Sequence, residues 1–268
     1  LLITLFLSSY FYSIVEEDPL PTLGDYSSAS ISLSGEYELG RLWLAMYRGS
    51  TKEHSDPLMR TYLEDLIYRL SETSEVRDRR FEFIILEDES INAFAAPGGI
   101  IGINLGMFLN TKREGELASV MCHELAHLSQ RHYARSQNRS SPLANALMIL
   151  GSIAVAAASR NPEAIMIAPA AMQQMSINYT RSNEKEADRI GFNNLVKAGF
   201  DPNDMTMMFQ RMQDKYQRED SEQFSYLMTH PLPSERLTDM RIRADNISKP
   251  SEGSFRDNLD FYFMQKRS

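Results

Sequence analysis

The residues best suited to chemistry in this chain are the two histidines and the glutamate of the pentapeptide His123-Glu124-Leu125-Ala126-His127. Residues four positions apart lie on one face of a helix, so both imidazoles can bind one zinc ion while Glu124 acts as a general base. A catalytic zinc ion takes three protein ligands and a water molecule. The pattern therefore predicts His123 and His127 as zinc ligands and requires a third ligand elsewhere. The alternative is a surface helix that carries two histidines by chance.

The acidic segment NEKEAD at residues 183–188 offers that third ligand. Glu184 and Asp188 would project from one side of a helix, whereas Glu186 would point about 200° away from Glu184. Glu184 can coordinate zinc directly, and Asp188 can hydrogen-bond the second nitrogen of a histidine ligand. Without the two histidines, a solvated charged helix face would be the better interpretation. We predict one Zn²⁺ per chain, with Glu184 as its third ligand.

A histidine between turn-forming residues is a further candidate. His230 lies in the segment Thr-His-Pro-Leu-Pro, whose prolines keep the chain out of a helix until Ser234, the predicted cap of the next helix. A rigid loop of this kind can position the imidazole to stabilise the oxyanion of a tetrahedral intermediate. It could equally place the imidazole in the fourth position of the zinc ion and keep the enzyme inactive. Arg236 could serve charge stabilisation or packing.

The two other histidines, His54 and His132, and the single cysteine are given structural roles. His132 follows His127 by five residues, about 140° further around a helix, and so should face away from the metal. Cys122 is expected to be a small buried residue and not a thiolate ligand. One cysteine also excludes an internal disulfide and a four-cysteine zinc site.

The candidate ligands must be positioned mainly by helices. Thr111 followed three residues later by Glu114 has the pattern of a capping box, so the helix with both zinc histidines should begin there and run to about Arg135. A helix capped by Ser182 or Asn183 should carry the third ligand. Periodicity and capping patterns predict further helices over residues 36–48 and 56–71, and after the pair Asp201-Pro202.

Two segments rich in β-branched and aromatic residues predict a small sheet, RFEFIIL at 80–86 and INAFAAPGGIIGIN at 91–104. The segment with the proline should lie near an edge of that sheet. An edge strand beside the zinc could pair with an extended substrate, although an ordinary strand with a turn explains the pattern as well. The candidate substrate-binding residues are Asn92, Ala93, Phe94 and Ala95. The expected fold is α+β, a mainly helical zincin-like (gluzincin) domain. Its sheet should lie over the helix that carries the HEXXH sequence at residues 123–127.

Composition limits the class of protein. The 268 residues are 43% hydrophobic, enough for a sizeable core, and the net charge of -8 gives no basic surface for nucleic acid. Residues 143–158 form a run of sixteen without a charge, followed by a second apolar stretch at 164–172. Because a membrane span needs about twenty residues, we predict a buried helical hairpin or a lid over the active cleft. Entry of this run into a bilayer is the alternative.

The two ends of the chain are predicted to lie outside the domain that carries the zinc ligands, which we place at residues 35–247. The first 15 residues include an apolar run of the length found in signal peptides, which predicts part of an export signal, with a buried strand as the alternative. Residues 16–34 are rich in Pro, Gly and Ser and should form an extended leader. Residues 248–268 are predicted to form a linker and the start of a truncated helical region.

Four segments resemble the HtpX and CAAX-prenyl-protease superfamily of zinc metallopeptidases: HEXXH, NEKEADRIG, INAFAAPGG and THPLPSERL. Four separate motifs make this resemblance far more specific than HEXXH alone. By position it implies the zinc ligands His123, His127 and Glu184, the catalytic base Glu124, and Asp188 as a second catalytic acid.

The resemblance also implies a biological setting. It suggests a periplasmic endopeptidase for quality control of the cell envelope, acting on unfolded or misassembled outer-membrane β-barrel proteins. The β-barrel assembly machinery is then a possible partner, and the C-terminal region would begin a set of tetratricopeptide-like repeats. The alternative from another class is a chaperone that binds such substrates without cutting them.

Overall fold

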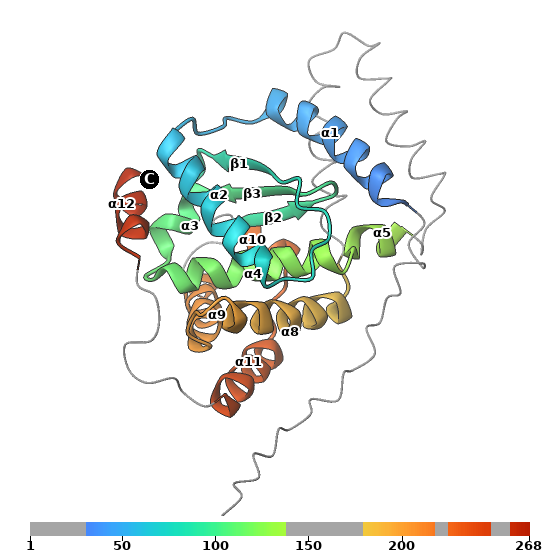
Figure 1. Ribbon diagram of the computed structural model, residues 1–268. Helices are drawn as coiled ribbons and strands as arrows, with labels where there is room; N and C mark the ends of the chain where they lie inside the picture. Colours follow the sequence, from blue (N-terminus) through green and yellow to red (C-terminus); the bar gives the residue numbers. More distant parts are fainter. Residues whose placement is uncertain (1–30, 138–178, 218–224, 248–257) are drawn as a thin grey trace, which may run out of the picture.

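The computed structural model describes residues 31–137, 179–217, 225–247 and 258–268. The predicted export signal, most of the leader and the apolar stretches at 143–158 and 164–172 lie outside the described residues. Within them, helices pack around a three-stranded sheet (Figure 1), which confirms the mainly helical α+β class. None of the helices in these ranges combines the length and the apolar character needed to cross a membrane.

The sheet consists of β1 (Glu82–Leu86), β2 (Ala93–Ala96) and β3 (Ile100–Asn104), in the order β1-β3-β2. β3 runs parallel to β1 and antiparallel to β2. Gly98 and Gly99, with φ of 77° and 78°, turn the chain between β2 and β3, a conformation that favours glycine. Because β3 is the central strand, β2 lies at an edge of the sheet, as predicted for the segment with the proline.

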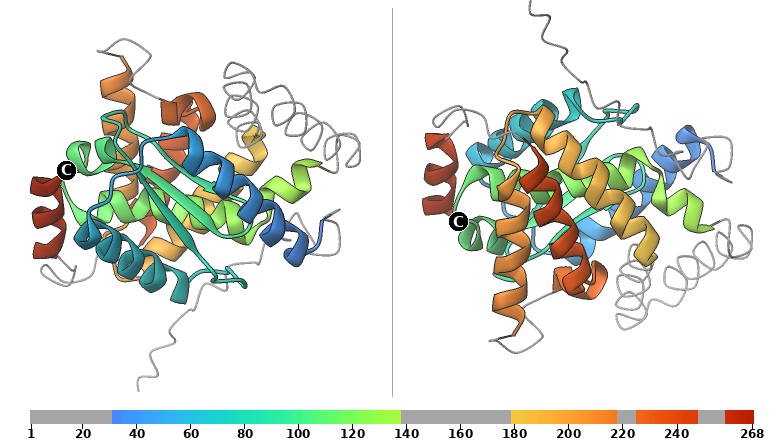
Figure 2. Two further views of the ribbon diagram at one scale, coloured as in Figure 1. Left: turned by 90° about the horizontal axis from the view of Figure 1, so that it is seen from above. Right: turned by 90° about the horizontal axis from the view of Figure 1, so that it is seen from below.

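The helices are α1 (Leu33–Ser50), α2 (Pro57–Glu72), α3 (Leu105–Asn110), α4 (Glu114–Ser129), α5 (His132–Gln137), α8 (Arg181–Lys197), α9 (Asn203–Tyr216), α10 (Ser225–Thr229), α11 (Ser234–Asn246) and α12 (Leu259–Arg267). α4 lies against the sheet on one side and against α8 and α9 on the other (Figures 1 and 2). The helix with the HEXXH sequence is therefore the central element of the domain.

The two faces of the sheet are covered by different helices, because successive side chains of a strand point to opposite faces. Ile84 and Ile100 pack against Trp43 of α1 in a small apolar cluster. Ile85 and Ile101 belong to the main core, which α2, α4 and α9 share. α12 adds two buried residues, Phe261 and Met264, to this main core.

α4 and α8 approach each other closely at the level of the HEXXH sequence. A Cβ atom at Gly191 would lie 2.9 Å from the backbone nitrogen of His123, so only glycine fits there. Ala126 of α4 packs against Ala187 and Ile190 of α8. Small residues on both helices thus set the distance between the two groups of candidate ligands.

The predicted capping box is wrong. α4 begins at Glu114, and the hydroxyl of Thr111 donates to the carbonyl of Met107 at the end of α3 instead. The carboxylate of Glu116 takes the reciprocal role, since it accepts a hydrogen bond from the backbone nitrogen of Lys112 at 2.6 Å. The threonine belongs to the preceding helix, a relation that the local pattern does not reveal.

Other helix boundaries differ by a few residues from the predictions. α1 begins at Leu33, inside the predicted leader. Thr180, and neither Ser182 nor Asn183, caps α8, and its hydroxyl accepts a hydrogen bond from the backbone nitrogen of Asn183. α11 begins at Ser234 itself, so this residue is not its cap. The larger difference is that α4 ends at Ser129 and not near Arg135, with consequences for the site.

Candidate metal centre

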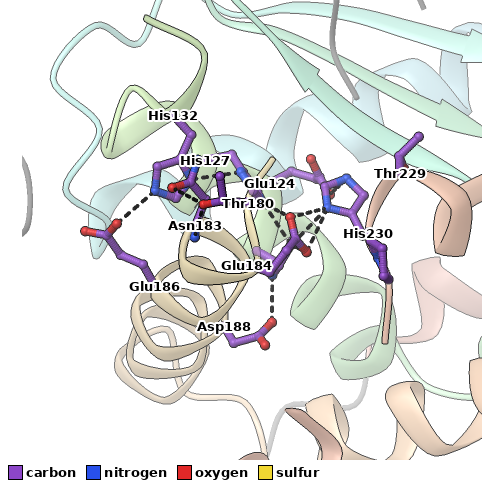
Figure 3. A network of polar contacts seen from close by, with 12 residues as sticks. Glu124, His127, His132, Thr180, Asn183, Glu184, Glu186, Asp188, Thr229 and His230 are labelled. Carbon is purple, nitrogen blue, oxygen red and sulfur yellow. Dashed lines mark hydrogen bonds and ion pairs between the residues drawn. The ribbon is translucent and has the colours of Figure 1, made fainter. Parts of the chain in front are cut away.

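Four side chains from three segments converge inside the domain (Figure 3). His123 and His127 come from α4, Glu184 comes from the first turn of α8, and His230 follows α10 directly. Each offers one ligand atom, and these atoms all lie within 4.8 Å of one another. All four residues are buried. The structure thus brings together the three predicted ligands and the loop histidine.

The separations between these atoms suit a single metal ion. The Nε2 atoms of His123 and His127 are 3.0 Å apart, and the Glu184 carboxylate lies 3.5 Å and 3.4 Å from them. Nδ1 of His230 lies 3.1 Å from the same carboxylate. Ligands at about 2 Å from a tetrahedral zinc ion would be about 3.4 Å apart. Two or three imidazoles with one carboxylate also form a donor set typical of zinc.

Glu124 lies beside this group with an unused carboxylate. It is 1% exposed, and neither of its oxygens has a hydrogen-bond partner among the described residues. Burial raises its pKa above the usual value, because desolvation disfavours the charged form. Nε2 of His230 lies 3.6 Å from Oε1 of Glu124, too far for a hydrogen bond. A buried carboxylate without a hydrogen bond costs free energy, so a metal-bound water would fit this position.

Asp188 and Arg236 form a buried pair behind His123. Arg236 donates two hydrogen bonds to Asp188, at 2.6 Å and 2.7 Å, and lies 2.9 Å from an oxygen of Glu184. Asp188 Oδ1 lies 3.0 Å from Nδ1 of His123. Burial opposes ionisation of Asp188, but the Arg236 guanidinium outweighs it and lowers the pKa of Asp188. These contacts favour a positioning role for Arg236 over direct contact with a substrate.

The predicted substrate-binding strand lies beside the centre. Ala93, Phe94 and Ala95 belong to β2, Asn92 precedes it, and β2 packs against α4. On its outer side β2 pairs with no other described strand. A hollow next to His127 has a wall formed by Ala95 of this strand.

The prediction that His132 faces away from the metal is wrong. Its Nδ1 lies 2.9 Å from Nδ1 of His127, and its Nε2 lies 3.1 Å from Glu186. The chain turns at Arg131, which has a φ of 51°, so His132 does not continue the line of α4. Neither of the two residues before His132 is a glycine or a proline, so the sequence contains no sign of this turn.

Two tyrosines at the centre were not predicted. The ring of Tyr179 stacks on His127 with centroids 4.1 Å apart, and Tyr226 stacks on His230 at 4.6 Å. Both tyrosines enclose imidazoles in apolar surfaces. No sequence pattern singles them out.

The residues expected to have structural roles lie outside the group of ligand atoms. Cys122 is fully buried, burial raises the pKa of its thiol, and its sulfur accepts a hydrogen bond from Asn194 at 3.5 Å. His54 is bonded through its backbone nitrogen to the carbonyl of Ile85, beside β1.

The comparisons with known proteins agree with this geometry. Residues 57–244 match peptidase family M48, a range that includes all four residues of the cluster and Glu124. The chain belongs to peptidase family M48. This metallopeptidase family implies a metal ion, and the four buried side chains fit one. The resemblance noted from the four sequence segments is thereby confirmed.

Among curated relatives, the chain is 42% identical over 239 residues to a putative beta-barrel assembly-enhancing protease of Vibrio cholerae, covering 87% of this chain and 49% of the relative. It is 37% identical over 258 residues to the beta-barrel assembly-enhancing protease of Escherichia coli, covering 94% and 52%. The mitochondrial metalloendopeptidase OMA1 of Schizosaccharomyces pombe is 25% identical over 234 residues, covering 85% and 66%. This M48 chain spans about half the length of the first two relatives.

Proposed function

We propose that the chain is a zinc-dependent endopeptidase whose active centre consists of His123, His127, Glu184 and Glu124. The observation that carries this proposal is the buried carboxylate of Glu124, which has no hydrogen bond to the described residues, next to three convergent ligand side chains. A bound Zn²⁺ would polarise the scissile carbonyl and lower the pKa of its water. Membership in a metallopeptidase family supports the assignment.

The proton steps of peptide hydrolysis fall to Glu124. As a general base it takes a proton from the attacking water, and as a general acid it passes that proton to the leaving amine. Its low exposure excludes bulk water, which would compete for the proton.

The other predicted catalytic residues are assigned to positioning or to the resting state. Asp188, whose Oδ1 lies 3.0 Å from Nδ1 of His123, would accept the proton of that nitrogen and leave Nε2 free to bind the metal. Arg236 keeps Asp188 ionised and also contacts Glu184. His230 occupies the fourth ligand position at rest, a proposal supported by the 3.1 Å between its Nδ1 and Glu184. It would have to leave this position before water and substrate enter.

Extended substrates would add a strand to the free edge of β2. Backbone hydrogen bonds to the residues from Asn92 to Ala95 would fix the direction of the peptide, largely independent of its sequence. Because β2 packs on α4, the added strand would lie over the ligands. This mode of binding suits unfolded proteins, which offer extended segments.

The biological role that we propose is proteolytic quality control in the cell envelope. Two relatives carry the name beta-barrel assembly-enhancing protease, which supports unfolded or misassembled outer-membrane proteins as substrates. The β-barrel assembly machinery as a partner and a periplasmic location follow from the same relationship. These two relatives are about twice as long as this chain. The substrates, the partner and the location are therefore proposed from the relationship, and the metal site is proposed from the structure.

Zinc content and casein cleavage together test the proposed activity. The purified protein should contain zinc and cleave casein, while Glu124→Gln should keep the zinc and lose at least about 100-fold in kcat, because the amide cannot accept a proton. A chaperone that only binds unfolded proteins would show no cleavage in either form. Cleavage by Glu124→Gln at the wild-type rate would contradict the role of Glu124.

A further inference from the structure

We propose that His132 and Glu186 position His127 for metal binding, through a chain of hydrogen bonds that starts at the outer nitrogen of His127. This inference rests on the proposed function, because it assigns residues that support the same metal centre. Both residues stand outside the set of candidate ligands. They act on the metal only through His127.

The distances and the burial define the chain of hydrogen bonds (Figure 3). Nδ1 of His127 lies 2.9 Å from Nδ1 of His132, and Nε2 of His132 lies 3.1 Å from Oε2 of Glu186. His127 is 2% exposed, His132 is fully buried, and Glu186 is 8% exposed. Bulk water therefore has little access to these polar atoms.

The chemistry of the three groups sets the direction of every hydrogen bond. An ionised carboxylate only accepts, so the Nε2–H of His132 must donate to Glu186. The other nitrogen of a neutral imidazole is an acceptor, so Nδ1 of His132 accepts the proton of Nδ1 of His127. His127 then has its lone pair on Nε2, the atom that faces His123 and Glu184. These hydrogen bonds thus select the tautomer of His127 that a metal ligand requires.

Arg135 supports this direction. Its guanidinium donates a hydrogen bond to the same Oε2 atom of Glu186 at 3.0 Å. The positive charge favours the ionised form of Glu186, which can only accept. The carboxylate of Glu186, which is the last acceptor in this series of hydrogen bonds, is thus also held by Arg135 of α5.

The fold creates the contact through an unusual turn. On a continuous helix His132 would lie about 140° around from His127 and could not reach it. α4 instead ends at Ser129, and Arg131 adopts a left-handed conformation that is unfavourable for a residue with a side chain. Such conformations persist where the surroundings enforce them, and they are frequent at functional sites.

α1 and the residues directly before it provide contacts that hold this turn. Nε of Arg131 donates to Glu36 at 2.9 Å, and a second guanidinium nitrogen donates to the carbonyl of Ile31. Arg131 and Glu36 are each 7% exposed. A buried ion pair at this point fixes the chain just before His132.

Both candidate histidine ligands thus have an anchored outer nitrogen. His123 reaches a carboxylate directly, since Asp188 lies 3.0 Å from its Nδ1. In the case of His127, the imidazole of His132 bridges the larger distance to Glu186. A histidine that only filled space in the core would not need a carboxylate on its far side and an imidazole on its near side.

Two nearly isosteric substitutions separate positioning from packing. In His132→Asn the side-chain oxygen can occupy the place of Nδ1 and accept the proton of His127, whereas His132→Leu has a similar shape and no acceptor. For each protein we would measure the Zn²⁺ dissociation constant by chelator competition and the urea unfolding of the metal-free form. His54→Leu, a change outside the centre, is the control.

We expect His132→Leu to weaken Zn²⁺ binding by about 10-fold to 100-fold, the range found when an outer partner of a metal ligand is lost. His132→Asn should recover most of this loss. Glu186→Gln should weaken binding less than His132→Leu, because the amide can still accept but is uncharged. If His132→Leu does not fold, the comparison of Glu186→Gln with the wild type carries the test.

The inference is overturned if His132→Leu, or Glu186→Gln in its place, binds Zn²⁺ as tightly as the wild type. It is also overturned if the Leu and Asn variants lose affinity equally, in proportion to the lost stability of the metal-free protein. A wild-type protein without affinity for Zn²⁺ would instead contradict the proposed function and the inference together. If only the inference fails, the wild type still binds Zn²⁺ and cleaves casein. If the proposed function fails, it does neither.

Discussion

The three carboxylates of the centre differ in their electrostatic surroundings. Glu184 and Asp188 both contact Arg236, and each has a pKa below its usual value although burial opposes this. Glu124 has no such contact with an arginine among the described residues, and its pKa is raised by burial. His230 and His123 are the main groups that lower the pKa of Glu184, and Arg236 lowers that of Asp188. These surroundings support the proposed roles of Glu184 as a ligand, of Asp188 as its support and of Glu124 as the group that exchanges a proton. The neighbouring charges and the burial of each carboxyl group thus set its pKa.

His230 is the residue whose removal should increase activity. Its Nδ1 lies 3.4 Å from Nε2 of His123, within the ligand cluster, and we propose that its imidazole takes the place of a catalytic water at rest. His230→Ala should therefore raise the rate of casein cleavage several-fold. A fall in kcat with an unchanged zinc content would instead support a role of His230 in stabilising the oxyanion.

At the scale of elements, the contact between α4 and α8 determines where Glu184 lies. Gly191→Ala places a Cβ atom 2.9 Å from the backbone of α4, which cannot yield as a flexible side chain would. We expect a loss of about 1–3 kcal/mol in stability, larger than the gain of up to about 1 kcal/mol in helix propensity. Zinc affinity should fall as well.

Gly49→Ala is the matched control for this prediction. Gly49 also lies in a helix, α1, but a Cβ atom there would meet nothing within 4 Å. Urea unfolding should show this variant to be as stable as the wild type or more so. Equal effects of the two alanines would contradict the close packing of α8 on α4.

Asp204 links the beginning of α9 to that of α4 and gives a pH-dependent contribution. Burial raises its pKa to about 7, despite Arg113 at 3.2 Å, whereas the unfolded chain titrates near 3.8. The folded protein thus binds the extra proton between these values, so this contribution to stability is present at low pH and is lost as the pH rises to about 7. Asp204→Asn should lose less stability than the wild type between about pH 5 and about pH 8, by up to about 3 kcal/mol.

Urea unfolding of both proteins at the two pH values measures this difference, and the other titrating groups cancel in the comparison. The same pH dependence in both would show that Asp204 is already ionised at pH 5. A Cβ atom at Gly115 would lie 1.8 Å from Oδ2 of Asp204, so a glycine at this position lets the Asp204 carboxyl approach the first turn of α4.

The elements that carry the ligands could be predicted because the evidence for them is local. The spacing of the ligands by four residues identifies α4 and α8, although the predicted capping residues of both helices are wrong, and the Pro-Gly-Gly segment identifies the edge strand. The turn at Arg131 could not be predicted, because it depends on Glu36, which is 95 residues away in sequence. His132 is the buried histidine at the centre whose position was predicted wrongly. Its position depends on this distant contact.

At the scale of the whole molecule, the centre joins segments that are far apart in sequence. His123 and His230 are separated by 107 residues, and Glu184 lies between them on a different helix. Several charged and polar groups are buried there together, an arrangement that a metal ion would stabilise. The centre and the fold should therefore depend on each other, so metal analysis tests both.

The most direct test of the central claim is the zinc content of the purified protein with and without Glu184→Ala. We predict one zinc ion per chain in the wild type and a loss of most of it in the variant, because the three remaining imidazoles are uncharged and Arg236, 2.9 Å from Glu184, would no longer be neutralised by that carboxylate. The folded state of the variant is checked by circular dichroism. Equal zinc in both proteins, or none in the wild type, would contradict the metal centre described.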